Sequence, residues 1–255
     1  MDINTKVSPS LHPTVIESIE GYNEETASHV ADALRAFTTA YTQLGKIHEF
    51  REAIAPDTSK TEDAKLLRVS DYATNRMNEA TKAFDNADKG LLARIAHAEA
   101  ELTTPLKATK AISGVAVEIR AHVKALPVDE RRAWFAEALE ANDTASIEAV
   151  LAGPGYLSGL QAKEVAHYTR LYHEKLNPQM FQRLQVMKQA HIMLRERAGL
   201  VISGVQKAMG ADFRKVQQVE ARIKASQNKV AGLETDEDRR EYFRRQDAAF
   251  RGRQA

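Results

Sequence analysis

The residues best placed for chemistry are Glu164 and His167, because Glu-x-x-His spacing puts a carboxylate and an imidazole on one face of a helix. Di-iron helical bundles use this spacing, but they need a second such pair and further carboxylates from other helices. The chain contains no second Glu-x-x-His pair. We therefore expect no metal ion and no other cofactor, and a helical-bundle metalloenzyme remains the less favoured alternative.

Other catalytic motifs are missing from the sequence. It has no His-Glu-x-x-His, no Gly-x-Ser-x-Gly, no phosphate-binding loop and no cysteine. Gly153, Gly155 and Gly159 lack the spacing and the strand-turn-helix context of a dinucleotide-binding loop, so turns are their expected place. The sequence therefore predicts no catalytic residue and a protein that is not an enzyme.

The C-terminal segment is the other candidate site, because it is rich in arginine with interleaved aromatic residues. The candidate partner-binding residues are Arg239, Arg240, Tyr242, Phe243, Arg244, Arg245, Phe250 and Arg251. Arginine and aromatic side chains are typical anchors of protein interfaces, but they also hold phosphates and stack on bases. A solvated tail is the third interpretation. Because no recognition-helix motif accompanies the charge, protein binding is favoured and nucleic-acid binding is the alternative.

The composition of the whole chain favours an all-α protein. Of its 255 residues, 43% are apolar, 28% are charged and only 6% are aromatic, as in bundles and coiled coils. No apolar run reaches the length of a membrane-spanning helix, and the N-terminus lacks the basic and apolar regions of a signal peptide. We therefore expect no membrane span and a chain that is made and kept in the cytoplasm.

Charge is unevenly distributed along the chain. Residues 1–177 carry 20 basic and 26 acidic side chains, whereas residues 178–255 carry 16 basic and 9 acidic ones. Such asymmetry suits packing within the chain, head-to-tail assembly, or contact with an acidic partner or nucleic acid, and a solvated basic face is an equally weighted alternative.

The chain is expected to divide into five segments. These are a flexible N-terminal arm at 1–13, a long antiparallel helical hairpin at 14–104, a compact region of short helices at 105–176, a long basic helix at 177–233 and an arginine-rich terminal helix or tail at 234–255.

The hairpin is predicted from two seams of apolar residues spaced three and four apart. The first helix should begin near Thr14 and end before Pro56, and the second should run to Leu102. Ser59 and Glu62 have capping-box spacing, so the second helix should start there. Many seam positions are alanine, so the hairpin should need cover from the basic helix, another subunit or both.

In the compact region, a helix is expected at 106–126, and Pro127 should open the next one. A break and a new cap are expected at 142–144, and a turn at 153–155.

The long basic helix is predicted from one stripe of apolar residues between Pro178 and Leu233. Gly199, Gly204 and Gly210 interrupt it, and each should mark a bend or a close helix crossing. Beyond the stripe, Thr235 and Asp238 have capping-box-like spacing, which predicts a separate terminal helix.

Residues 137–160, EALEANDTASIEAVLAGPGYLSGL, resemble a segment of tailed-bacteriophage and prophage proteins of undefined role. In that segment a short alanine-rich helix, a break, a second helix and a Leu-Ser-Gly-Leu ending recur. The matching residues here are Ala138, Leu139, Asn142, Asp143, Val150, Leu151, Ala152, Pro154, Leu157, Ser158, Gly159 and Leu160. The resemblance implies a structural component of a virion or prophage and carries no catalytic residue.

These observations predict an all-α, elongated helical bundle with a long antiparallel hairpin and a long basic C-terminal helix. The expected function is that of a non-enzymatic assembly protein that binds itself or other virion proteins through helix contacts. Internal, scaffold-like and head–tail roles all remain open. Its expected place is the host cytoplasm during assembly and then the virion. A nucleic-acid-associated protein that uses the basic C-terminal third is the alternative.

Overall fold

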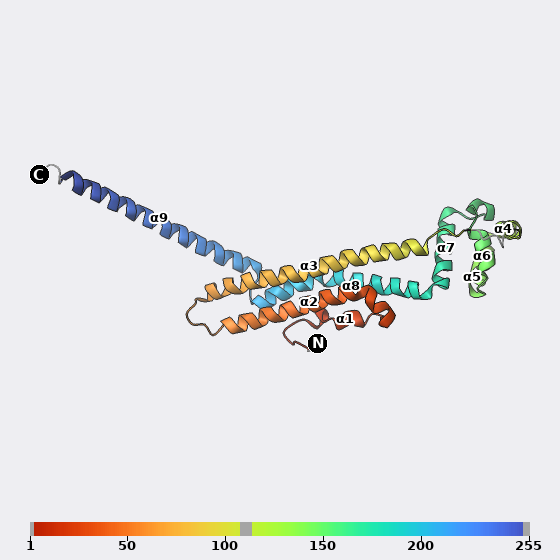
Figure 1. Ribbon diagram of the computed structural model, residues 1–255, viewed down its shortest axis with the longest axis horizontal. Helices are drawn as coiled ribbons and strands as arrows, with labels where there is room; N and C mark the ends of the chain where they lie inside the picture. Colours follow the sequence, from red (N-terminus) through yellow and green to blue (C-terminus); the bar gives the residue numbers. More distant parts are fainter. Residues whose placement is uncertain (1–2, 108–113, 252–255) are drawn as a thin grey trace. The chain divides into compact units, whose positions relative to one another are not determined.

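The computed structural model describes residues 3–107 and 114–251 of the chain (Figure 1). Over these ranges the backbone forms α-helices, short 3-10 helices and their connections, with no strand, which confirms the all-α prediction. None of the helices in these ranges is long and apolar enough to cross a membrane.

The helices follow one another along the chain without any intervening sheet in the described ranges. Their bounds are η1 Pro9–Leu11, α1 Thr14–Glu17, α2 Glu24–Ile54, α3 Glu62–Leu102, α4 Ala116–Ala125, α5 Val128–Glu140, α6 Thr144–Leu151, η3 Gly155–Ser158, α7 Ala162–Leu176, α8 Pro178–Met209 and α9 Phe213–Arg251. The chain divides into two compact units. One comprises Met1–His12, Thr38–Ala83 and Arg197–Ala255, and the other comprises Pro13–Phe37 and Phe84–Glu196.

The antiparallel hairpin of α2 and α3 confirms the main prediction from the apolar seams. In the unit that contains residues 13–37 and 84–196, the rings of Phe37 and Phe84 lie 5.1 Å apart, and Arg94 pairs with Asp32 at 2.9 Å. In the other unit, the ring of Phe50 stacks on that of Tyr72.

The first helix of the hairpin starts later than its periodicity indicated. Residues from Thr14 form only the short α1, and Gly21 then takes a left-handed φ of +84°. Asn23 starts α2, because its side chain accepts hydrogen bonds from the backbone N–H groups of Glu25 and Thr26. The prediction of one helix from Thr14 was therefore wrong, because a glycine turn and a new cap interrupt the apolar pattern.

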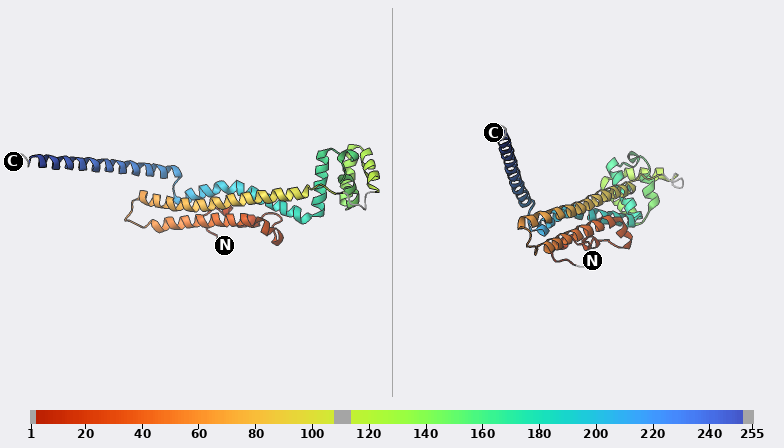
Figure 2. Two further views of the ribbon diagram at one scale, coloured as in Figure 1. Left: turned by 45° about the horizontal axis from the view of Figure 1, so that its top comes forward. Right: turned by 60° about the vertical axis from the view of Figure 1, so that its left-hand side comes forward.

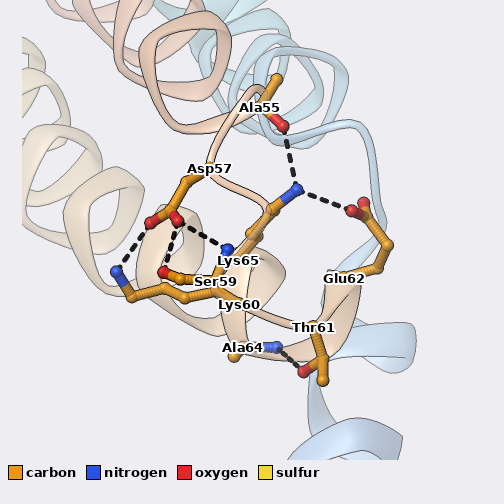
Figure 3. Close-up of polar contacts among 8 residues, drawn as sticks. All are labelled: Ala55, Asp57, Ser59, Lys60, Thr61, Glu62, Ala64 and Lys65. Carbon is orange, nitrogen blue, oxygen red and sulfur yellow. Dashed lines mark hydrogen bonds and ion pairs between the residues drawn. The ribbon is translucent and has the colours of Figure 1, made fainter.

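The connection between α2 and α3 differs from the expected capping box at Ser59 and Glu62 (Figure 3). Both the N–H and the hydroxyl of Ser59 donate to Asp57, at 3.0 and 2.5 Å, so Ser59 is engaged within the turn. Thr61 caps α3 instead, because its hydroxyl accepts from the N–H of Ala64 at 3.2 Å.

Lys60 and Lys65 close the same connection with polar contacts. Lys60 donates to Asp57 at 2.8 Å, and its bond is the largest cause of the lowered pKa of that carboxyl. The Lys65 ammonium donates to the carbonyl of Ala55 and to Glu62, both at 2.9 Å (Figure 3). Lys65 thereby satisfies a terminal carbonyl after α2 and pairs with an acidic side chain in the first turn of α3.

The N-terminal arm was expected to be flexible, but residues 3–12 pack against α2. Val7 and Leu11 are buried, and the ring of His12 meets that of Tyr41 edge to face. The N–H of Asn4 donates to the Tyr41 hydroxyl at 2.7 Å, and that hydroxyl donates back to the Asn4 carbonyl. Two apolar side chains and a buried hydroxyl therefore hold a segment that is short and rich in turn residues.

The region of short helices has its own hydrophobic core. The buried members of this core are Val123, Phe135, Ala138, Ile147, Val150, Leu151, Leu160, Tyr168 and Tyr172. Arg131 ties its loops together, since the guanidinium donates to the carbonyls of Val123, Leu126 and Gly159. The Asp143 side chain caps α6 by accepting from the N–H of Ser146, as the break at 142–144 predicted.

The helix expected at 106–126 is shorter in the structure. Only α4, from Ala116, is helical within the described part of that range, and residues 108–113 of the prediction lie outside the described residues. Pro127 precedes α5 as its N-cap, with Asp129 and Glu130 in the first turn.

The long basic helix is two helices. Gly210, with φ of +75°, follows the last residue of α8, and Asp212 caps α9 by accepting from the N–H of Lys215 at 2.7 Å. The expected break after Leu233 does not occur, because α9 runs through it and the Thr235 hydroxyl bonds to the Ala231 carbonyl inside the helix.

The other two glycines of the stripe differ from each other. A Cβ at Gly204 would lie 3.0 Å from a methyl group of Leu44, so Gly204 marks a close helix approach, as expected. A Cβ at Gly199 would have nothing within 4 Å, so that residue marks neither a bend nor a close crossing.

Candidate interaction surface on α9

The first turns of α9 are anchored within their own unit of the chain. Val216 and Val219 are each 5% exposed, and Ile223 is half-buried. The Arg222 guanidinium pairs with the Asp63 carboxylate at the start of α3. These contacts cover the apolar seam of α9 as far as Ile223.

The side chains described beyond Ile223 have no such cover. Every side chain described between Lys224 and Arg244 is exposed, including Val230 at 50% and Leu233 at 62%. These two residues continue the seam of Val216 and Val219 with the same three- and four-residue steps. Figure 2 shows α9 as one unbroken helix from its first turn to Arg251. A seam that is buried at its beginning is therefore open to solvent over the following turns.

A helix of this kind is poorly stabilised on its own. Residues 224–251 would extend about 40 Å at roughly 1.5 Å per residue, and a helix in a protein gains most of its stability from packing of an apolar face. Gly232 sits in the middle of this stretch and costs up to about 1 kcal/mol relative to alanine, and a Cβ there would have nothing within 4 Å. The exposed valine and leucine would gain stability from a partner that buries them.

The charge of the exposed stretch changes from negative to positive between residues 238 and 239. Residues 234–238 carry four acidic side chains and no basic one, and residues 239–245 then carry four arginines and one glutamate. A segment with adjacent acidic and basic runs is complementary to an antiparallel copy of itself.

All the candidate partner-binding residues from the sequence lie on the C-terminal half of α9. The side chains of Arg239, Arg240 and Arg244 are exposed. The backbone of the others is helical, and their side chains lie outside the described residues; they are Tyr242, Phe243, Arg245, Phe250 and Arg251.

Glu164 and His167, the other pair singled out by spacing, lie on α7. The Glu164 carboxylate accepts from the N–H of Gln161 at 2.8 Å and completes the capping box of α7. His167 is exposed beside Tyr168. Within residues 3–107 and 114–251, no three histidine or acidic side chains are grouped as metal ligands would be. The Glu164 side chain therefore caps the N-terminus of α7.

Three features that position α9 were not identified from the sequence. Asp212 caps the helix, Asp63 pairs with it from α3, and Gly210 supplies the left-handed turn before it. The sequence marked Gly210 only as one of three possible bends. The Gly-Ala-Asp sequence at 210–212 was the available signal, since it combines a helix stop with an N-cap residue.

Comparisons with protein-family models, with curated proteins and with solved structures found no match to this chain.

Proposed function

We propose that the protein is a non-enzymatic assembly component that self-associates through the exposed part of α9. The observation that carries the proposal is the change in burial along one seam, from 5% exposure at Val219 to 62% at Leu233. An apolar seam that continues past its intramolecular cover is suited to burial against another helix.

The occupant of this seam is a second copy of the chain, in an antiparallel orientation. If two copies of α9 cross between Asp238 and Arg239, the acidic run at 234–238 of each faces the basic run at 239–245 of the other. A parallel pair in register would instead place like charges together, which is unfavourable. Charge complementarity therefore selects both the partner and the direction.

The setting that we propose is a bacteriophage or prophage particle, as the resemblance at residues 137–160 implies. Several of the resembling residues, including Val150, Leu151 and Leu160, belong to the core of the short-helix region, so packing accounts for their identity here. The virion setting is tested by mass spectrometry of purified particles from the source strain. Absence of the chain from the particles would leave self-association without that setting.

The test of self-association is analytical ultracentrifugation of the full chain across a wide concentration range. We expect a V230D/L233D variant to sediment as a monomer at concentrations where the parent chain is a dimer. The matched control is A225D/N228D, which also adds two negative charges but at exposed positions off the seam of the same helix. If A225D/N228D weakens association as much as the seam variant, charge and not the seam drives assembly.

The absence of cysteine from the sequence gives a direct test of orientation. In the antiparallel pair, Leu233 lies against the aliphatic stem of Arg244 of the other copy, since long arginine stems can cover apolar surface. The two Leu233 positions are then about 16 Å apart along the helix axis, at roughly 1.5 Å per residue. Oxidation should therefore crosslink an L233C/R244C variant between chains and leave L233C alone uncrosslinked. Efficient crosslinking of L233C alone would indicate a parallel pair.

A nucleic-acid-binding protein is distinguished in the same samples. Binding through the arginines would give a co-sedimenting 260 nm signal that disappears steeply as salt rises, because neutralised phosphates release counterions. Retention of nucleic acid by the V230D/L233D variant would show that the two activities are separate.

A further inference from the structure

A cavity of about 520 Å³ opens between α2, α3 and α8, within the unit that contains residues 13–37 and 84–196. Its volume falls within the range of small-molecule sites, about 300–1,000 Å³. The residues that line it are His29 from α2, Ala93, Arg94, His97, Ala98 and Glu101 from α3, and Met180, Arg183 and Met187 from α8.

The lining combines an apolar surface with the guanidinium groups of Arg94 and Arg183. Met187 and Ala98 are buried, and Met180 is half-buried. Methionine side chains adapt to irregular shapes and are common on surfaces that accept different apolar partners. The apolar part of this cavity is therefore able to accommodate a hydrocarbon or aromatic body.

Arg183 is the lining cation whose charge is least compensated. It forms no ion pair with any carboxylate of the described residues, and its Nε–H is buried without a hydrogen-bond partner there. Arg94, by contrast, pairs with Asp32 at 2.9 Å. A half-buried guanidinium with an unsatisfied donor favours an anion, and its planar fork matches a carboxylate.

The other ionisable groups of the lining are His29, His97 and Glu101. The pKa of His29 is lowered, first by burial and then by the charges of Arg183 and Arg94. Glu101 is the one acidic residue of the lining, and it lies 3.4 Å from His97. Arg94 is paired with Asp32 and Glu101 lies beside His97, so Arg183 is the cation of the lining for which the described residues provide no ion pair.

We propose that this cavity binds a small carboxylic acid with an apolar body, with the carboxylate paired to Arg183 and the apolar part against Met180 and Met187. This site is separate from the proposed α9 surface, and neither depends on the other. Inorganic anions lack the apolar part, and neutral hydrocarbons leave the arginine unpaired, so the combination of both features defines the ligand class.

The test uses octanoate and the uncharged 1-octanol as probes, with calorimetric titration of the full chain. We expect octanoate to bind more tightly than 1-octanol. An R183Q variant should weaken octanoate binding at least about tenfold, because a charge-assisted hydrogen bond is lost, and should leave 1-octanol binding unchanged. The control is R195Q on the same helix, since Arg195 does not line the cavity.

A second variant tests the location without removing charge. Ala93 is exposed at the cavity, so A93F should fill part of the space without cutting the core and should weaken both probes. Equal binding of octanoate and 1-octanol, an R183Q variant that binds octanoate as the parent does, or no binding of octanoate at all would each overturn the proposal. Dimer formation in the same samples would be unaffected, because α9 does not line the cavity.

Discussion

Val219 and Val230 occupy the same seam of the same helix, yet Val219 is 5% exposed and Val230 is 50% exposed. The first lies where α9 is held near α3 by the Arg222–Asp63 ion pair, and the second lies beyond that contact. The difference shows that a three- and four-residue spacing predicts which face of a helix can be buried, but not what will bury it. Among the described side chains, cover within the chain ends at Ile223, and our proposal is that a second copy covers Val230 and Leu233.

The same charge placed at each of the two valines should have very different effects on stability. V219D should lower the free energy of unfolding by about 2–4 kcal/mol, because it buries a carboxylate without a partner. V230D should change it by less than about 0.5 kcal/mol at concentrations where the chain is a monomer. Urea unfolding at low protein concentration measures both, and similar losses for the two variants would mean that the exposed stretch is covered after all.

The junction before α9 is the next place to test. Gly210 has a positive φ, and a Cβ there would clash with the Arg51 guanidinium, so G210A should destabilise the chain by about 1–2 kcal/mol. G199A is the matched control inside α8, where nothing lies within 4 Å, and it should stabilise the chain by up to about 1 kcal/mol. Opposite signs for the two substitutions are expected in thermal or urea unfolding, and equal signs would remove Gly210 as the determinant of the break.

Gly232 allows the effect of a helical glycine to be measured in the exposed stretch of α9. G232A should add up to about 1 kcal/mol of helix stability and tighten the dimer, since less ordering is required on association. Circular dichroism at low concentration and sedimentation at high concentration would report the two effects. The expected gain comes from higher helix stability and not from a new contact at residue 232. A loss of dimer in G232A would instead indicate that Gly232 lies at a close contact between the two helices.

The smallest expected effect is one of pH, and it distinguishes the covered helices from α9. Burial is the main cause of the lowered pKa values of His29 and His48, so the unfolded chain binds more protons as the pH falls below about 6.5. Stability should therefore decrease between pH 7.5 and 5.5, and an H29Q/H48Q variant should show a flatter dependence. Dimer formation should not change over this range, because α9 contains no histidine. A flat melting temperature in the parent chain would contradict the assignment of these two histidines.

Much of the fold was predictable because long apolar seams specify long helices. The α2–α3 hairpin followed from such seams, and Asp143 was recognised as part of a break and cap. The choice between two neighbouring hydroxyl groups as the cap of α3 was not predictable. Ser59 has the right spacing, but its hydroxyl donates to Asp57, and Thr61 caps the helix instead. Order in the N-terminal arm depends on Tyr41, which is distant in sequence from Asn4 and His12.

Of the two candidate sites, one could be identified from the sequence and the other could not. The exposed arginines Arg239, Arg240 and Arg244 were identified from composition, since a charged run is visible in a single segment. The cavity at Arg183 was not, because its lining comes from three helices far apart in the sequence and its character depends on which carboxylates lie near each arginine.

The most direct test of the central claim is the concentration dependence of the mass of the full chain, measured by sedimentation equilibrium for the parent and for V230D/L233D. A chain of 28.4 kDa that approaches twice this mass, with the variant remaining at 28.4 kDa, is the predicted result. A parent chain that stays at 28.4 kDa at every concentration would contradict the proposal that a second copy covers the exposed seam of α9.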